Sequence, residues 1–128
     1  AGQRRVEQLG SEYAREMARL YRIAKVECRT RLLRLYGQGL RRVVLFGAAE
    51  SGELAWSASQ ETPMTVLGVV DNDPLKHRAV IGGLLVESPE AIEGWHPDGV
   101  IIAASRCGDE IYRQIECLKD KGIAVSKL

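Results

Sequence analysis

The hydrophobic positions in the first third of the chain follow a helical period. Apolar or small residues recur there in steps of three or four, and no proline occurs between about Val6 and Tyr36. This pattern predicts one amphipathic helix, about 45 Å long at about 1.5 Å per residue. Gly37 and Gly39 follow it, and glycine favours the left-handed conformation that ends a helix. The apolar positions are Leu9, Tyr13, Met17, Leu20, Ala24, Cys28, Leu32 and Leu35.

The spacing of these positions bears on whether the helix pairs with another helix. From Tyr13 to Leu35 the period is about 3.7 residues, whereas a left-handed coiled coil repeats every 3.5. A strict heptad repeat begun at Tyr13 places Glu27, Arg31 and Arg34 in the seam. A long parallel coiled coil is therefore disfavoured, and pairing over two or three turns stays open.

After residue 40 the pattern changes to short apolar runs that alternate with helical segments. Continuous apolar runs at 43–46, 66–70 and 99–104 predict buried parallel strands, and 122–128 predicts a last strand. Helices are expected at 50–60, after Ser88 and at 109–121, with short extended pieces around Gly82 and Gly83. The alternation predicts an α/β fold: a doubly wound, Rossmann-like, mostly parallel sheet of about five short strands. We therefore expect a helix over 1–40 and an α/β domain over 41–128.

The net charge of +1 hides a division between these two parts. Residues 1–42 contain eleven Lys and Arg against four Asp and Glu, and residues 43–128 contain seven against thirteen. Three interpretations are open: a solvated helix face, a helix that follows a nucleic-acid backbone, or a basic arm that attracts the acidic domain of a second copy. We favour the third, a homodimer formed through the N-terminal helix.

Composition narrows the class of protein. No apolar run approaches the roughly 18 residues of a membrane span, and the first apolar cluster is interrupted by arginines, unlike a secretory signal. The three cysteines are odd in number and lack metal or redox spacing, which indicates a cytoplasmic location. His77 and His96 have no suitably spaced partners, so no metal site is expected. The sequence begins without Met, and we expect a fragment of a longer protein.

The segment VVLFGAAESG, residues 43–52, carries the candidate chemistry. It approaches the dinucleotide-binding pattern GxGxxG, in which the first glycine makes a tight turn, the second lets the backbone approach a pyrophosphate and the third allows close helix packing. Gly47 and Gly52 supply the first and third glycines, and Ala49 replaces the second. Glu50 adds a carboxylate to the first helical turn, where it would cap the free amides or repel a phosphate. Asp71 ends the second strand, where an acidic residue binds a ribose hydroxyl.

Two interpretations of this loop are open. It binds a nucleotide-type ligand, or its small residues serve only the packing of strand and helix while Asp71 shapes a turn.

Further motifs give the domain a family resemblance. VVLFGAAESGELA, VLGVVDNDPLKHRAVIGGLLVESPEAI and DGVIIAAS resemble the Rossmann-type domain that precedes the catalytic part of CapD-type polysaccharide-biosynthesis proteins, which are nucleotide-sugar dehydratases. They are also similar to the nucleotide-sugar-binding half of bacterial sugar acyltransferases and to CoA-binding-like domains. The resemblance covers about residues 41–128 and implies a bacterial origin. The usual loop of that family is GAGxxG, so Ala49 is a departure.

The resemblance implies a ligand site at the ends of three strands. It assigns Gly47, Ala48, Ala49, Glu50, Ser51 and Gly52 to the phosphate loop, and Asp71, Asn72 and Asp73 to the ribose or base side. Ala104, Ser105 and Arg106 would face the ligand from the third strand. Domains of this kind often bind nucleotides or regulate without a catalytic centre of their own.

The residues offer little sign of catalysis. No Ser-His-Asp set or carboxylate pair is discernible, and Tyr112 and Lys119 lack the spacing of a tyrosine–lysine dehydrogenase pair. We expect no catalytic centre in this chain, but a binding or regulatory module for NAD(H), a nucleotide sugar or CoA. Two alternatives stay open. One is a fragment of a nucleotide-sugar-modifying enzyme, and the other is the effector domain of a regulator that binds nucleic acid through a domain upstream.

Overall fold

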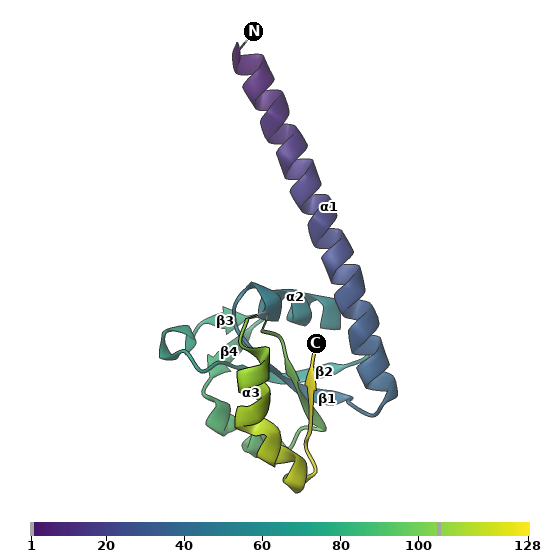
Figure 1. The fold of residues 1–128 in the computed structure, drawn as a ribbon, viewed down its shortest axis with the longest axis vertical. Helices are drawn as coiled ribbons and strands as arrows, with labels where there is room; N and C mark the ends of the chain where they lie inside the picture. The colour runs from purple at the N-terminus through teal and green to yellow at the C-terminus, as the bar shows by residue number, and fades with distance from the viewer. Residues whose placement is uncertain (1, 105) are drawn as a thin grey trace.

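The computed structural model describes residues 2–104 and 106–128 as a long helix joined to a helix-covered sheet (Figure 1). The sheet has six strands in the order β3-β4-β2-β1-β5-β6. All neighbouring strands pair in parallel except β3 and β4. The strands are β1 (Arg42–Phe46), β2 (Thr65–Val70), β3 (Val80–Ile81), β4 (Leu84–Glu87), β5 (Gly99–Ile102) and β6 (Ala124–Lys127). The predicted Rossmann-like class is confirmed, with β3 as an additional short antiparallel strand.

Helices cover both faces of this sheet. Helix α1 (Gly2–Gly37) packs on α2 (Glu50–Ser59) over one face, and α3 (Gly108–Ile115) covers the other. The described residues also form four 3-10 turns: η1 (Pro74–Lys76), η2 (Pro89–Ala91), η3 (Glu93–Trp95) and η4 (Glu116–Lys121). Among the described residues no helix is long and apolar enough to cross a membrane.

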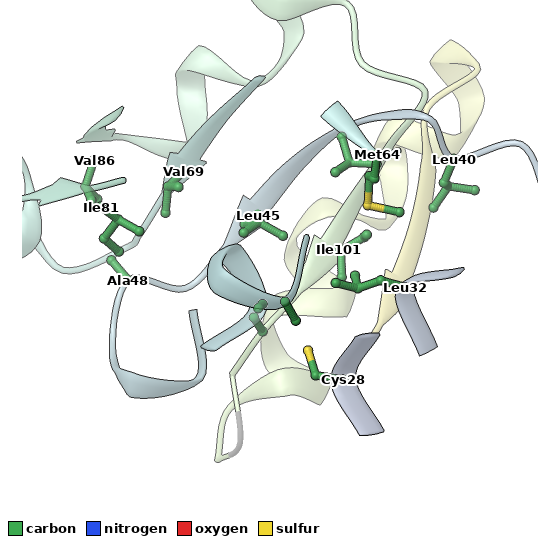
Figure 2. Close-up of a cluster of buried hydrophobic side chains, with 14 residues drawn as sticks. Cys28, Leu32, Leu40, Leu45, Ala48, Met64, Val69, Ile81, Val86 and Ile101 are labelled. Atoms are coloured by element: carbon green, nitrogen blue, oxygen red, sulfur yellow. The ribbon is translucent and has the colours of Figure 1, made fainter. Parts of the chain in front are cut away.

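The hydrophobic core has two halves, one on each face of the sheet. On the α2 face, Cys28 and Leu32 of α1 join Leu45 of β1 and Ile101 of β5 (Figure 2). On the α3 face, Phe46, Val100 and Ile111 belong to the second cluster. The central strands are therefore apolar on both sides, which is why they read as continuous apolar runs.

Two expected helices differ from the structure. Ser88 does cap a turn, because its Oγ accepts a hydrogen bond from the Glu90 amide at 3.4 Å, but only the 3-10 turns η2 and η3 follow. His96 then adopts a left-handed conformation with φ of 49°, and Pro97 cannot continue a helix. The helix expected at 109–121 is α-helical only to Ile115 and tightens to the 3-10 turn η4.

Helix α1 has two parts with different surroundings. Cys28 and Leu32 are buried against the sheet domain, whereas Leu9, Tyr13 and Leu20 are exposed. The N-terminal half projects away from the sheet (Figure 1). At the junction, Lys25 and Arg29 form ion pairs with Glu61 at 3.8 and 3.4 Å. Some of the basic residues of the helix are thus already paired with an acidic residue of the same chain.

Candidate functional site

The loop between β1 and α2 lies at the carboxyl edge of the sheet and contains two glycines that no other residue can replace without displacement. Gly47 has φ of +126°, and a Cβ there would stand 2.6 Å from the Ala103 carbonyl oxygen. A Cβ on Gly52 would stand 1.8 Å from the Gly47 carbonyl oxygen. The geometry gives these residues the two structural tasks predicted for the first and third glycines.

Ala49 has a different environment. It precedes α2 in an extended conformation, with φ of −87° and ψ of −163°, which any L-residue adopts. The residue is exposed, and it lines a cavity. The alanine that replaces the second glycine therefore does not strain the backbone of the loop, and the residue lines the cavity.

Asp71 connects the loop to the end of β2. Its Oδ2 accepts a hydrogen bond from the Ala48 amide at 2.8 Å, and its Oδ1 accepts one from the Asp73 amide at 2.8 Å. An ionised carboxylate has about four acceptor positions, so Asp71 can still accept a hydroxyl donor. The carboxylate thus holds the glycine loop in place beside any ligand that it binds.

A cavity of about 690 Å³ opens at this edge and collects most of the predicted site residues. The predicted residues that line it are Gly47, Ala48, Ala49, Glu50, Ser51, Asp71, Asn72, Ala104 and Arg106. Gly52 is buried beneath the loop, and Asp73 caps η1 by accepting a hydrogen bond from the Leu75 amide at 3.0 Å. Ser105 lies outside the described residues.

The cavity also includes residues absent from the predicted set. They are Phe46, Glu53, Lys76, Ala103, Cys107 and Ile111. Lys76 had a sequence signal, since it completes the DNDPxK turn that supports the family resemblance. Ile111 had none, because its place depends on how α3 packs across the end of β5.

The charges around the cavity are mixed. Glu50, Glu53 and Asp71 contribute carboxylates, and Lys76 and Arg106 contribute cations. No side chain caps the start of α2 at Ala49, and within the described residues the Glu50 carboxylate forms no hydrogen bond. The first amides of α2 therefore remain available to an anion, as at other helix N-termini.

Asn72 has a structural partner at the rim. Its amide group exchanges two hydrogen bonds with Gln114 of α3, at 2.8 and 2.9 Å. This pair fixes the loop after β2 to α3 across the end of β1, so that the Asn72 amide is already engaged.

Tyr112 and Lys119, which lack the sequence spacing of a dehydrogenase pair, are hydrogen-bonded to each other in the structure. Lys119 Nζ donates a hydrogen bond to the Tyr112 hydroxyl, and this bond raises the pKa of Lys119. Neither residue lines the cavities at the carboxyl edge, so the pair lies apart from the candidate site. No group of three or more potential metal ligands occurs in the described part of the chain.

The family comparison accounts for the α/β part of this architecture. The profile of the C2185-like N-terminal domain matches residues 39–125. The chain belongs to this family. The match runs from the turn before β1 into β6 and leaves out α1, and it does not show the CapD-type relationship suggested by the motifs. No curated protein sequence matches this C2185-like chain significantly.

Solved structures similar to the C2185-like chain share its Rossmann-like fold. UDP-D-quinovosamine 4-dehydrogenase from Vibrio fischeri is 22% identical with a TM-score of 0.54, over 67% of this chain and 76% of that one. RSP, a Rex-family repressor, is 15% identical with a TM-score of 0.58, over 77% of this chain and 58% of that one. RSP in complex with β-NADH is 18% identical with a TM-score of 0.56, over 68% and 44%. The chain thus spans about half of the RSP structures.

Proposed function

We propose that the α/β part is a binding module for a nucleotide-containing ligand, held in the cavity at the carboxyl edge of the sheet. The observation that carries this proposal is the convergence of a glycine turn, an uncapped helix start and a strand-end carboxylate on one cavity of about 690 Å³. In open α/β sheets, ligands bind at this edge where the strand order reverses. RSP has been solved in complex with β-NADH and with β-NAD+, which supports the same class of ligand here.

The proposed ligand contacts follow from the charges. A pyrophosphate lies at the first amides of α2, where the helix dipole, Arg106 and Lys76 favour an anion and offset the nearby Glu50 carboxylate. Asp71 accepts a ribose hydroxyl and disfavours a 2′-phosphate at the same position. The arrangement therefore favours NAD(H) over NADP(H). A nucleotide sugar or CoA shares the phosphate part of this site.

We assign the module a regulatory rather than a catalytic role. The described residues that line the cavity include no histidine and no serine–histidine–aspartate set. Binding without chemistry suits a domain that reports ligand occupancy to the long helix joined to it.

Two alternative functions each have one structural neighbour in their favour. The likeness to UDP-D-quinovosamine 4-dehydrogenase favours a nucleotide-sugar-modifying enzyme of polysaccharide biosynthesis, related to the CapD-type proteins, of which this chain is a fragment. The likeness to RSP bound to β-NAD+ and operator DNA favours the effector part of a transcriptional regulator. In that case nucleic acid is bound by a domain outside this sequence.

We also propose that α1 joins two copies of the chain. Leu9, Tyr13, Met17 and Leu20 are between 42% and 67% exposed on the projecting half of the helix. From Tyr13 to Ala24 the apolar positions keep heptad spacing, which is enough for a short seam with a second α1. A continuous exposed apolar stripe of this kind marks an interaction surface.

Binding to the purified chain tests the ligand proposal. We expect NADH, NAD+, a UDP-sugar or CoA at millimolar concentration to raise the midpoint of thermal unfolding, and NADP+ to have a smaller effect than NAD+. For whichever compound stabilises the chain, Arg106→Ala should weaken binding about tenfold, because one charged hydrogen bond is worth about 1.5 kcal/mol. Arg113→Ala is the matched control, since this exposed arginine of α3 does not line the cavity. Absence of stabilisation by every compound would refute the proposal.

A further inference from the structure

Helix α1 forms one wall of a second cavity that the sequence did not indicate. This cavity, of about 240 Å³, lies between α1, α2 and the end of β5. Ala24, Glu27, Cys28 and Arg31 line it from α1. These residues precede the C2185-like match, which begins at residue 39, so the wall comes from outside the α/β unit that the family shares.

The second cavity adjoins the first. Ser51, Ala103 and Ala104 line both of them. Ser51 lies in the first turn of α2, where the proposed phosphate group sits, and the two alanines follow β5. A ligand that extends beyond its phosphates along the carboxyl edge therefore passes from the first cavity into the space beneath α1.

The lining of the second cavity indicates what it accepts. Most of it is apolar, formed by Cys28, Leu54, Ile102, Ala103 and Leu128. Burial raises the pKa of the Cys28 thiol, more than the nearby Arg31 guanidinium lowers it, so the thiol stays protonated and uncharged at neutral pH. Polar groups come from Ser51, Glu27 and Arg31. A flat, weakly polar ring fits such a surface better than a hydroxyl-rich sugar, which would need many hydrogen-bond partners.

We propose that the α1 segment 24–31 is part of the ligand site and encloses the base ring of the second nucleoside of a dinucleotide, so that ligand occupancy and the docking of α1 stabilise each other. This inference rests on the proposed function, because it assigns the rest of the same ligand. Glu27 and Arg31 would interrupt a coiled-coil seam, and their place on the cavity wall accounts for them. The reciprocity is thermodynamic: a ligand that contacts docked α1 favours the docked state by its differential affinity.

The experiment compares ADP, which corresponds to one half of the dinucleotide, with NADH, which is the whole dinucleotide. ADP reaches only the first cavity, whereas NADH occupies both, and titration calorimetry measures both affinities on the full chain. Ala24→Phe places a ring in the second cavity. Ala18→Phe is the matched control, because Ala18 is exposed on the projecting part of the same helix. We expect Ala24→Phe to weaken NADH at least tenfold and leave ADP unchanged, while Ala18→Phe changes neither.

The outcomes separate this inference from the proposed function. If the unaltered chain binds neither ADP nor NADH, the proposed function fails and this inference fails with it. If ADP binds and Ala24→Phe leaves the NADH affinity unchanged, only the role of α1 is overturned. If Ala24→Phe also abolishes ADP binding, the smaller variant Ala24→Val decides. A selective loss of NADH affinity then supports the inference, and equal losses for both ligands overturn it.

Discussion

Gly52 is the most tightly packed glycine of the candidate site, because its backbone lies against the Gly47 carbonyl group. A Cβ there would stand 1.8 Å from that oxygen, which is backbone and cannot turn aside as a side chain would. We expect Gly52→Ala to lower the free energy of unfolding by about 3 kcal/mol, the upper end of overpacking costs. Urea denaturation followed by circular dichroism measures this change.

Gly10→Ala provides the control for Gly52→Ala. Gly10 also lies in a helix, but a Cβ added to it would meet nothing within 4 Å, so that alanine should stabilise the chain by up to about 1 kcal/mol. Equal changes in the free energy of unfolding for the two variants would mean that Gly52 does not lie against the Gly47 carbonyl group.

For individual residues, prediction succeeded where one local rule decides the geometry. The tasks of Gly47 and Gly52 follow from the strand–turn–helix pattern alone. The double engagement of Asp71, with the amides of Ala48 and Asp73, did not follow, because it depends on how β1 and β2 are aligned. Ala49 is the intermediate case. Its position in the loop was predicted, but its unstrained backbone conformation was not.

At the scale of elements, α1 contributes to the core with its last turns. Leu32 is fully buried in the cluster with Leu45 and Ile101, whereas its neighbour Leu33 is 43% exposed. We expect Leu32→Ala to cost about 2–5 kcal/mol of unfolding free energy, as for other buried leucines. Leu33→Ala should cost less than about 1 kcal/mol. Equal costs in thermal or urea unfolding would mean that α1 does not pack on the sheet as described.

The elements differ in how far sequence determines them. The apolar runs of β1, β2 and β5 and the helical pattern of α2 were predicted close to their observed bounds, because each is a strong local sequence pattern. The segment after Ser88 was harder, since a valid capping residue precedes turns that Pro97 and the left-handed His96 soon end. The cavity wall from α1 could not be predicted, because no local pattern encodes how one helix crosses another. The division of the chain at residue 40 remains a prediction.

In the whole molecule, a basic and partly apolar helix projects from the acidic α/β part of the chain. Lys25 and Arg29 pair with Glu61 of the same chain, so these two cations are already engaged at the base of the helix. In the outer half, Arg19 pairs with Glu16 of the same helix at 3.4 Å. Ion pairs between exposed side chains contribute little free energy, so burial of the apolar side chains of the outer half is the main force available for joining two copies.

A substitution in the proposed seam tests this assembly. Leu20→Glu puts a carboxylate in the middle of the Tyr13–Ala24 stretch, where pairing would bury two like charges against each other, at one seam position. We expect the unaltered chain to sediment as a dimer at tens of micromolar in analytical ultracentrifugation, and the Leu20→Glu chain as a monomer. Val26→Glu is the matched control, because Val26 is similarly exposed, at 48% against 46% for Leu20, but lies about 240° further round the helix at about 100° per residue. That variant should remain dimeric. A monomeric unaltered chain, or dimers that survive Leu20→Glu, would show that α1 is not the contact between copies.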